Sequence, residues 1–91
     1  MKPIKMFYQT MCPFCRRAQQ YIDELKEERP DFQSIEIEKI EENEHPDIAE
    51  QYDYYYVPTF YIDGEKVHEG GIFKNEMEAV KSRLESAKNN L

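Results

Sequence analysis

The sequence contains no tryptophan, only three glycines and only two cysteines among its 91 residues. The cysteines, Cys12 and Cys15, are close neighbours in the chain, which excludes a secreted scaffold held by several disulfides between distant segments. A tetrahedral zinc site within one chain would need two further ligands. It would therefore require the fold to bring both histidines, His45 and His68, to the cysteines.

Positive charge and long apolar runs are also scarce. Lys and Arg total 12 against 19 Asp and Glu, so the formal net charge is −7. An acidic chain is poorly suited to unaided binding of nucleic acid or of an anionic membrane. No apolar run is long enough for a membrane helix, and residues 1–5 lack the apolar core of a signal peptide. We therefore expect a cytoplasmic, monomeric protein whose residues 1–91 form a single domain.

The apolar pattern predicts alternating strands and helices. Strands are predicted at residues 3–8, 34–40, 59–62 and 66–69, and helices after residue 13, after residue 45 and from residue 73 to 87. Asp63-Gly64 is a strong signal for a hairpin turn between the last two strands. The order β-α-β-α-β-β-α predicts an α/β fold, with a mixed four-stranded sheet and helices on both faces.

A Cys-x-x-Cys pair falls where the first predicted strand ends and the first predicted helix begins, with Pro13 in the first turn. A helix start carries unpaired backbone N–H groups and partial positive charge, which favour a thiolate on Cys12. Arg16 and Arg17 add positive charge nearby. Cys15 lies one turn further on, beside apolar helix positions, so we expect it to be shielded. Thiol–disulfide exchange requires this pairing of an accessible nucleophile with a resolving thiol.

Other interpretations of this pair stay open at the level of residues. A Cys-x-x-Cys pair is also half of a zinc or iron–sulfur site, and two subunits together would supply four thiolates. A third interpretation is an adaptor domain in which the thiols are incidental. The absence of a second Cys-x-x-Cys pair favours redox chemistry over a zinc site built within one chain.

A second feature, Val57-Pro58-Thr59, directly precedes the third predicted strand. A trans proline there is simply the residue that enters the strand, which is the common case. A cis proline would instead expose the backbone of Val57 beside the thiol site, where an extended substrate segment pairs as an added strand. The residues alone leave both forms open.

Four features together resemble the glutaredoxin and thioredoxin-like superfamily over essentially the whole chain. They are Cys12-Pro13-Phe14-Cys15, Val57-Pro58, the Asp63-Gly64 hairpin and Gly70-Gly71. Cys-Pro-aromatic-Cys followed by arginine is similar to a dithiol glutaredoxin, whereas the segments 57–67 and 74–76 are similar to the C-terminal half of a thioredoxin. The resemblance implies a thioredoxin-like fold, Cys12 as the attacking thiol, Cys15 as the resolving thiol and a cis Pro58.

The resemblance also implies a thiol–disulfide oxidoreductase that reduces protein disulfides or glutathione mixed disulfides. It implies no tightly bound cofactor, and either glutathione or thioredoxin reductase as the reductant. Two positions differ from the glutaredoxin pattern. Gln9 stands where glutaredoxins usually carry a Lys or Arg that holds a glutathione carboxylate. Residues 72–75 stand where acidic side chains usually meet the γ-glutamyl amine.

We expect substrates to contact the residues that surround the thiols. The predicted substrate-binding residues are Tyr8, Gln9, Pro13, Phe14, Arg16, Tyr56, Val57, Pro58, Gly70 and Gly71. No metal ligand is predicted. For the tyrosines at 52 and 54–56, we favour packing of one or two in the core, with the others at the surface, over a substrate groove. The acidic residues at 41, 42 and 44 are predicted to form a solvated connector.

Overall fold

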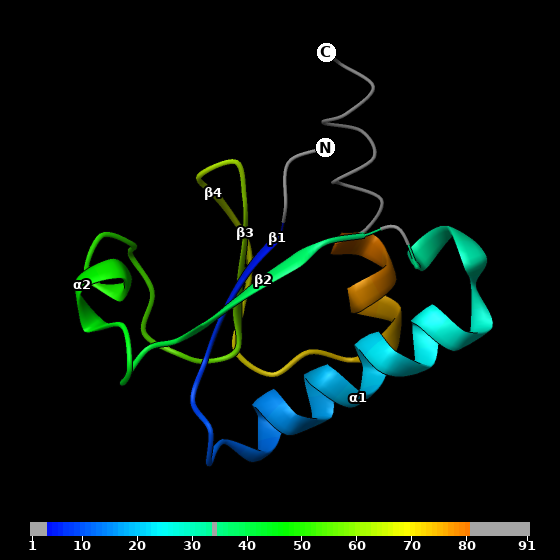
Figure 1. Cartoon of the computed structure of the whole chain (residues 1–91), viewed down its shortest axis with the longest axis horizontal. Coiled ribbons are helices and arrows are strands. Elements are labelled where there is room, and N and C mark those ends of the chain that lie inside the picture. The colour runs from blue at the N-terminus through cyan, green and yellow to red at the C-terminus, as the bar shows by residue number, and fades with distance from the viewer. Residues whose placement is uncertain (1–3, 34, 81–91) are drawn as a thin grey trace.

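The computed structural model of the protein describes residues 4–33 and 35–80. Strands and helices alternate in the predicted order (Figure 1). The elements are β1 (Ile4–Tyr8), α1 (Pro13–Glu28), the 3-10 turn η1 (Pro30–Phe32), β2 (Ile37–Glu41), α2 (Pro46–Ala49), β3 (Thr59–Ile62), β4 (Glu65–Glu69) and a last helix over residues 74–80. The predicted apolar face of this last helix continues to Leu84 and Ala87, which lie outside the described residues.

The four strands form one mixed sheet in the order β2-β1-β3-β4. β1 pairs with β2 in parallel and with β3 antiparallel, and β3 pairs with β4 antiparallel. The parallel pair needs a long crossover, which α1 supplies, whereas β3 and β4 are joined by the predicted hairpin. Asp63 and Gly64 both have positive φ there, as a two-residue hairpin turn of this type requires. The predicted mixed sheet is confirmed.

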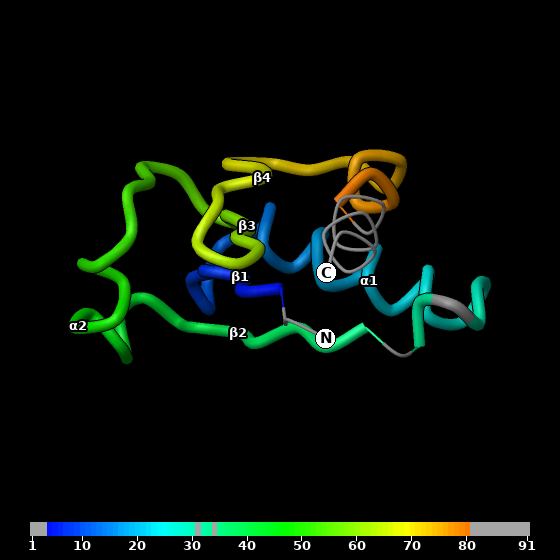
Figure 2. Tube along the Cα trace, turned by 90° about the horizontal axis from the view of Figure 1, so that it is seen from above, coloured from blue at the N-terminus to red at the C-terminus, as the bar shows by residue number. Residues whose placement is uncertain are grey.

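Helices cover both faces of the sheet, as predicted. Seen from above, α1 and the last helix lie on one side of the strands and α2 lies on the other (Figure 2). Successive side chains of a strand point to opposite faces, so Met6 packs on the α1 side while Phe7 packs towards α2. The core on the α1 side is the larger one, and it includes Ala18, Ile22 and Leu25 of α1 together with Met77 and Val80.

The first helix forms where its sequence signals lie. Pro13 occupies the first helical turn, the buried face repeats at the spacing of one helix side, and the helix ends at Glu28 just before Arg29-Pro30. β2 begins at Ile37, later than predicted, because the N–H of Ile35 still bonds the carbonyl of Phe32 in the preceding turn.

Three chain segments meet at one end of the sheet. The end of β1, the start of β3 and the end of β4 lie at the lower end in Figure 1, and the β3–β4 hairpin lies at the upper end. The fold therefore places the Cys12 turn, Pro58 and Gly70 at the same end.

Within the described residues, no helix is both long and apolar enough to span a membrane.

Candidate active site

The two cysteines form an asymmetric pair at the start of α1. Cys12 is the N-cap residue, and its Sγ accepts a hydrogen bond from the backbone N–H of Cys15 at 3.3 Å. Cys12 is partly exposed, whereas Cys15 is only 3 % exposed. Burial, reinforced by the contact with Cys12, raises the pKa of the Cys15 thiol well above its ordinary value. The predicted shielding of Cys15 is confirmed, and this thiol is held in its protonated form.

The Val57-Pro58 segment forms a wall beside Cys12. The Val57-Pro58 peptide bond is cis, and the Val57 carbonyl oxygen lies 3.8 Å from Cys12 Sγ. The backbone N–H of Gly70 donates to the Pro58 carbonyl at 2.8 Å. These contacts bring together Cys12, Val57, Pro58 and Gly70, which are predicted site residues from three separate segments of the chain.

The glycine pair allows aromatic side chains to approach this wall. Gly70 has a φ of 91°, which side-chain-bearing residues rarely adopt. A Cβ at Gly71 would lie 3.2 Å from a ring carbon of Phe14, so the ring packs directly on the backbone there. Phe14 and Tyr56 remain 56 % and 70 % exposed. The site around Cys12 is therefore rimmed by accessible aromatic rings.

Four predicted substrate-binding residues lie outside the Val57-Pro58 wall. Pro13 is exposed in the first turn of α1. Tyr8, Gln9 and Arg16 line a separate cavity that also contacts Cys15. The structure thus divides the predicted set into one group around Cys12 and another group beside Cys15.

The prediction that the acidic residues at 41, 42 and 44 form a solvated connector is wrong for Glu41. Glu41 is the last residue of β2 and is buried. Its carboxylate accepts two hydrogen bonds from Thr10, one from the hydroxyl at 2.7 Å and one from the backbone N–H at 3.0 Å. It also accepts from the N–H of Asn43 at 2.6 Å. These bonds, the Thr10 hydroxyl first, lower the pKa of Glu41. The carboxylate fixes the loop that leads to Cys12.

Glu42 holds the next part of the same loop. Its carboxylate accepts a hydrogen bond from the side-chain amide of Gln9 and another from the hydroxyl of Tyr54 at 2.7 Å. Burial, together with this bond to Glu42, raises the pKa of Tyr54. Among the tyrosines, Tyr52 and Tyr54 pack on Phe7 while the next two are exposed, which confirms the predicted division between core and surface.

A third carboxylate fixes the loop that leads into the Val57-Pro58 wall. Glu69, at the end of β4, accepts hydrogen bonds from the N–H groups of Tyr55 at 2.6 Å and Tyr56 at 3.0 Å. Lys66 donates to the same carboxylate at 2.7 Å. Lys66 first, and then the backbone donors, lower the pKa of Glu69 to about 2. The loop before Val57 is therefore held to the sheet by an ionised side chain.

The hydrogen bonds of the Glu69 carboxylate to Tyr55, Tyr56 and Lys66, called here the Glu69 clamp, predict a specific pH dependence of stability. The pKa of Glu69 is lowered from about 4.3 in the unfolded chain to about 2 in the fold. Its contribution is therefore complete above the unfolded value and is lost as the pH falls towards about 2. Urea unfolding at about pH 5 and about pH 2.5 should show a smaller loss of stability in Glu69→Gln than in the wild type.

Glu50→Gln is the matched control for this experiment, because Glu50 is exposed and no described residue bonds its side chain. Glu50→Gln should lose as much stability as the wild type on acidification. An equal loss in Glu69→Gln would contradict the clamp.

A metal site within one chain finds no support in the described residues. Across residues 4–33 and 35–80, no three Cys, His, Asp or Glu side chains gather closely enough to hold an ion. A metal centre at Cys12 and Cys15 would thus need ligands from outside these residues.

Comparison with known proteins identifies a family model and a relative whose sequences match this chain. The family model "Glutaredoxin" matches residues 4–67. The chain is 37 % identical over 82 residues to a protein named thioredoxin from Methanocaldococcus jannaschii, covering 89 % of this chain and 94 % of that protein. Both matches include the segment that carries the two cysteines and the Val57-Pro58 wall.

Solved structures agree with the fold. An uncharacterized thioredoxin-like protein from Clostridium perfringens superposes with a TM-score of 0.67 and 31 % identity, covering 92 % of this chain and 71 % of that one. Fasciola hepatica thioredoxin superposes with a TM-score of 0.66 and 23 % identity, covering 88 % of this chain and 77 % of that one. The thioredoxin-like fold predicted from the sequence is confirmed.

Proposed function

This chain belongs to the glutaredoxin family, and from that premise we propose that it is a dithiol oxidoreductase that reduces disulfides in other proteins. The observation that carries the proposal is the difference between its two thiols. Cys12 is accessible, with its sulfur beside the Val57 carbonyl, whereas Cys15 is buried one helical turn away. Such a pair supports an ordered reaction in which one thiol attacks and the other completes the exchange.

The first step is attack by the Cys12 thiolate on one sulfur of the substrate disulfide. A bond forms between Cys12 Sγ and that sulfur, and the other substrate sulfur leaves as a thiolate that takes up a proton. The helix start supports the thiolate, because the backbone N–H of Cys15 already donates to Cys12 Sγ at 3.3 Å. An extended substrate segment would pair with the exposed backbone of Val57.

The second step releases the reduced substrate. Cys15 loses its proton and attacks Cys12 Sγ, the mixed disulfide breaks, and the second substrate sulfur leaves as a thiolate that is then protonated. The substrate disulfide gains two electrons and two protons and becomes two thiols, while the protein loses the same electrons and protons as its two thiols become the Cys12–Cys15 disulfide. The raised pKa of Cys15 keeps this thiol protonated in the resting protein, which supports the order in which Cys12 attacks first.

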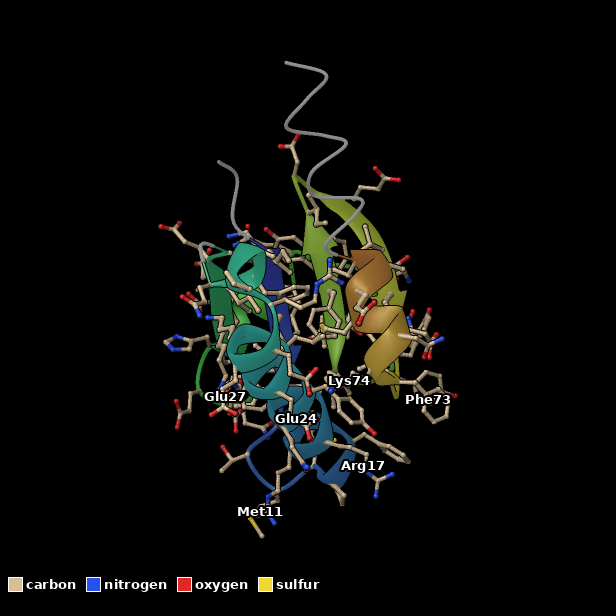
Figure 3. All side chains as sticks on the ribbon, turned by 90° about the vertical axis from the view of Figure 1, so that its right-hand side faces the viewer. Met11, Arg17, Glu24, Glu27, Phe73 and Lys74 are labelled. Carbon is tan, nitrogen blue, oxygen red and sulfur yellow. The ribbon has the colours of Figure 1, made fainter. Side chains whose placement is uncertain are left out.

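A dithiol-regenerating reductase of the thioredoxin reductase type is the proposed reductant. Glutathione is an anionic tripeptide, and the position at which glutaredoxins hold its carboxylate is Gln9, whose amide is engaged by Glu42. Lys74, which follows the glycine pair, is itself paired with Glu28 at 2.8 Å and Glu24 at 4.0 Å on α1 (Figure 3). Gln9 thus supplies no cation for a carboxylate of glutathione, and Lys74 supplies no carboxylate for its γ-glutamyl amine.

Two electron donors distinguish the alternatives. With a disulfide-containing protein as substrate, NADPH and thioredoxin reductase should sustain turnover by the wild-type protein. Glutathione with glutathione reductase should give much slower turnover. Faster turnover with glutathione would contradict the proposed reductant while leaving the dithiol exchange intact.

A further inference from the structure

The methionines among the described residues differ sharply in exposure. Met6 and Met77 are buried in the core, at 0 % and 2 % exposure, whereas Met11 is 78 % exposed. Met11 directly precedes Cys12 in the turn between β1 and α1, and its side chain projects away from the body of the protein (Figure 3). The disulfide exchange proposed above does not use this thioether. Met11 is therefore an accessible sulfur next to the nucleophile.

A hydrogen-bond donor lies beside the Met11 sulfur. Arg16 Nη2 is 3.9 Å from Met11 Sδ, and within residues 4–33 and 35–80 this sulfur is the only hydrogen-bond partner of the Arg16 side chain. A thioether is a weak acceptor, so the contact is weak. A sulfoxide oxygen on the same sulfur accepts hydrogen bonds better, and a bond from a charged donor is among the stronger ones. Arg16 therefore favours the oxidised form of Met11.

The state of the two thiols decides when Met11 is attacked. A hydroperoxide reacts first with an accessible thiolate, which in the dithiol protein is Cys12. Once Cys12 and Cys15 are joined in the disulfide that ends the proposed reaction, neither presents a thiolate. Met11 is then the exposed thioether of the described residues. Oxidation at Met11 would thus accumulate when the protein lacks a reductant.

We propose that Met11 is an oxidation site that regulates the proposed disulfide reduction, and that a hydroperoxide converts it to methionine sulfoxide in the disulfide form of the protein. The sulfur attacks the outer oxygen of the hydroperoxide, so that a sulfur–oxygen bond forms and the oxygen–oxygen bond breaks. The proton of the attacked oxygen passes to the other oxygen, which leaves as an alcohol, or as water from hydrogen peroxide. The sulfur loses two electrons and the peroxide gains them.

The effect on activity rests on the proposed function. Met11 and Phe14, which is 56 % exposed, place apolar surface on either side of Cys12 in the chain. A sulfoxide turns one of these side chains into a polar group, which loses water when a protein substrate covers it. Oxidation of Met11 should therefore raise the KM for a protein disulfide and lower kcat/KM roughly fivefold, the effect of losing one interface contact.

Peptide mass spectrometry tests the site without any turnover. The disulfide form, treated with hydrogen peroxide, should gain one oxygen at Met11 well before Met6 or Met77 does. After unfolding in urea the three methionines should react at similar rates, because burial no longer separates them. In the dithiol form, oxygen at Met11 should appear only after the disulfide has formed. Equal rates at the three methionines of the folded disulfide form, or a sulfoxide at Met11 ahead of the disulfide, would overturn the proposal.

Turnover of a protein disulfide tests the regulation. Peroxide treatment of the disulfide form should lower kcat/KM of the wild type roughly fivefold, whereas Met11→Leu should keep its own untreated value after the same treatment. Met11→Gln, which places a polar group at this position, should show the defect without treatment. An equal loss in Met11→Leu would overturn the regulation. Absence of turnover in the untreated wild type would contradict the proposed function, whereas the peptide map decides the oxidation site by itself.

The contact between the sulfoxide and Arg16 is tested by ¹H–¹⁵N NMR. The Nε–H signal of Arg16 should move when Met11 is oxidised. Arg17 is the matched control, because it is the next residue of α1, is exposed and has no side-chain partner among residues 4–33 and 35–80. Its Nε–H signal should stay in place. Equal movement of both signals would overturn the proposed contact.

Discussion

Replacement of Cys12 by serine should reduce the rate of disulfide reduction to the rate measured without the protein. The serine hydroxyl is not ionised near neutral pH, so the group that attacks the substrate is removed while the helix N-cap is retained. The measurement is turnover of a protein disulfide with NADPH and thioredoxin reductase. Circular dichroism of the variant provides the control for folding. Activity equal to that of the wild type would contradict the assignment of Cys12 as nucleophile.

Replacement of Cys15 should give a different defect, which separates the two roles. Cys15→Ser retains Cys12, so the first attack proceeds and the mixed disulfide accumulates because nothing resolves it. Mass spectrometry of the variant after incubation with substrate should show the covalent adduct, and a reducing agent should remove it. An adduct that forms on Cys12→Ser instead would reverse the two assignments.

Replacement of Phe7 by alanine should lower the free energy of unfolding by about 3–5 kcal/mol. The Phe7 ring is fully buried on the α2 face, with its centre 4.8 Å from that of Tyr52 and 5.0 Å from that of Tyr54. Removing it leaves a cavity and also breaks these aromatic contacts. Small domains are stable by only about 5–15 kcal/mol in total, so the variant should unfold at a much lower urea concentration.

Two further variants keep this prediction testable. If Phe7→Ala does not fold, Phe7→Leu should fold with a loss of about 1–1.5 kcal/mol. Phe73 is 67 % exposed and projects outward just before the last helix (Figure 3), so Phe73→Ala should change stability by no more than about 0.5 kcal/mol. Equal losses at the two phenylalanines would contradict the packing described for Phe7.

Local patterns account for most of the fold. The spacing of Ala18, Ile22 and Leu25 identifies one face of α1, and Asp63-Gly64 identifies the hairpin, because both signals arise from neighbouring residues. The helix start at Cys12 likewise follows from Pro13 in the first turn. These features give the element order, and the order restricts the sheet to a few topologies.

The parts that the sequence left undecided depend on contacts between distant segments. Glu41 lies in a run of acidic residues that is typical of a solvated connector, yet its carboxylate binds Thr10, which is 31 positions away. Site residues that act through long-range hydrogen bonds carry no local periodicity, so composition and spacing did not reveal them.

The hairpin turn has a practical consequence for studying this protein. It lies at the end of the sheet opposite the Cys12 turn (Figure 1), and a side chain at Gly64 would meet no atom within 4 Å. Lengthening an exposed turn costs little, since the entropy of loop closure grows slowly with length. A short tag or a fluorescent label inserted between Asp63 and Gly64 therefore offers a point of attachment for capturing trapped client proteins, with the thiols left facing the solution.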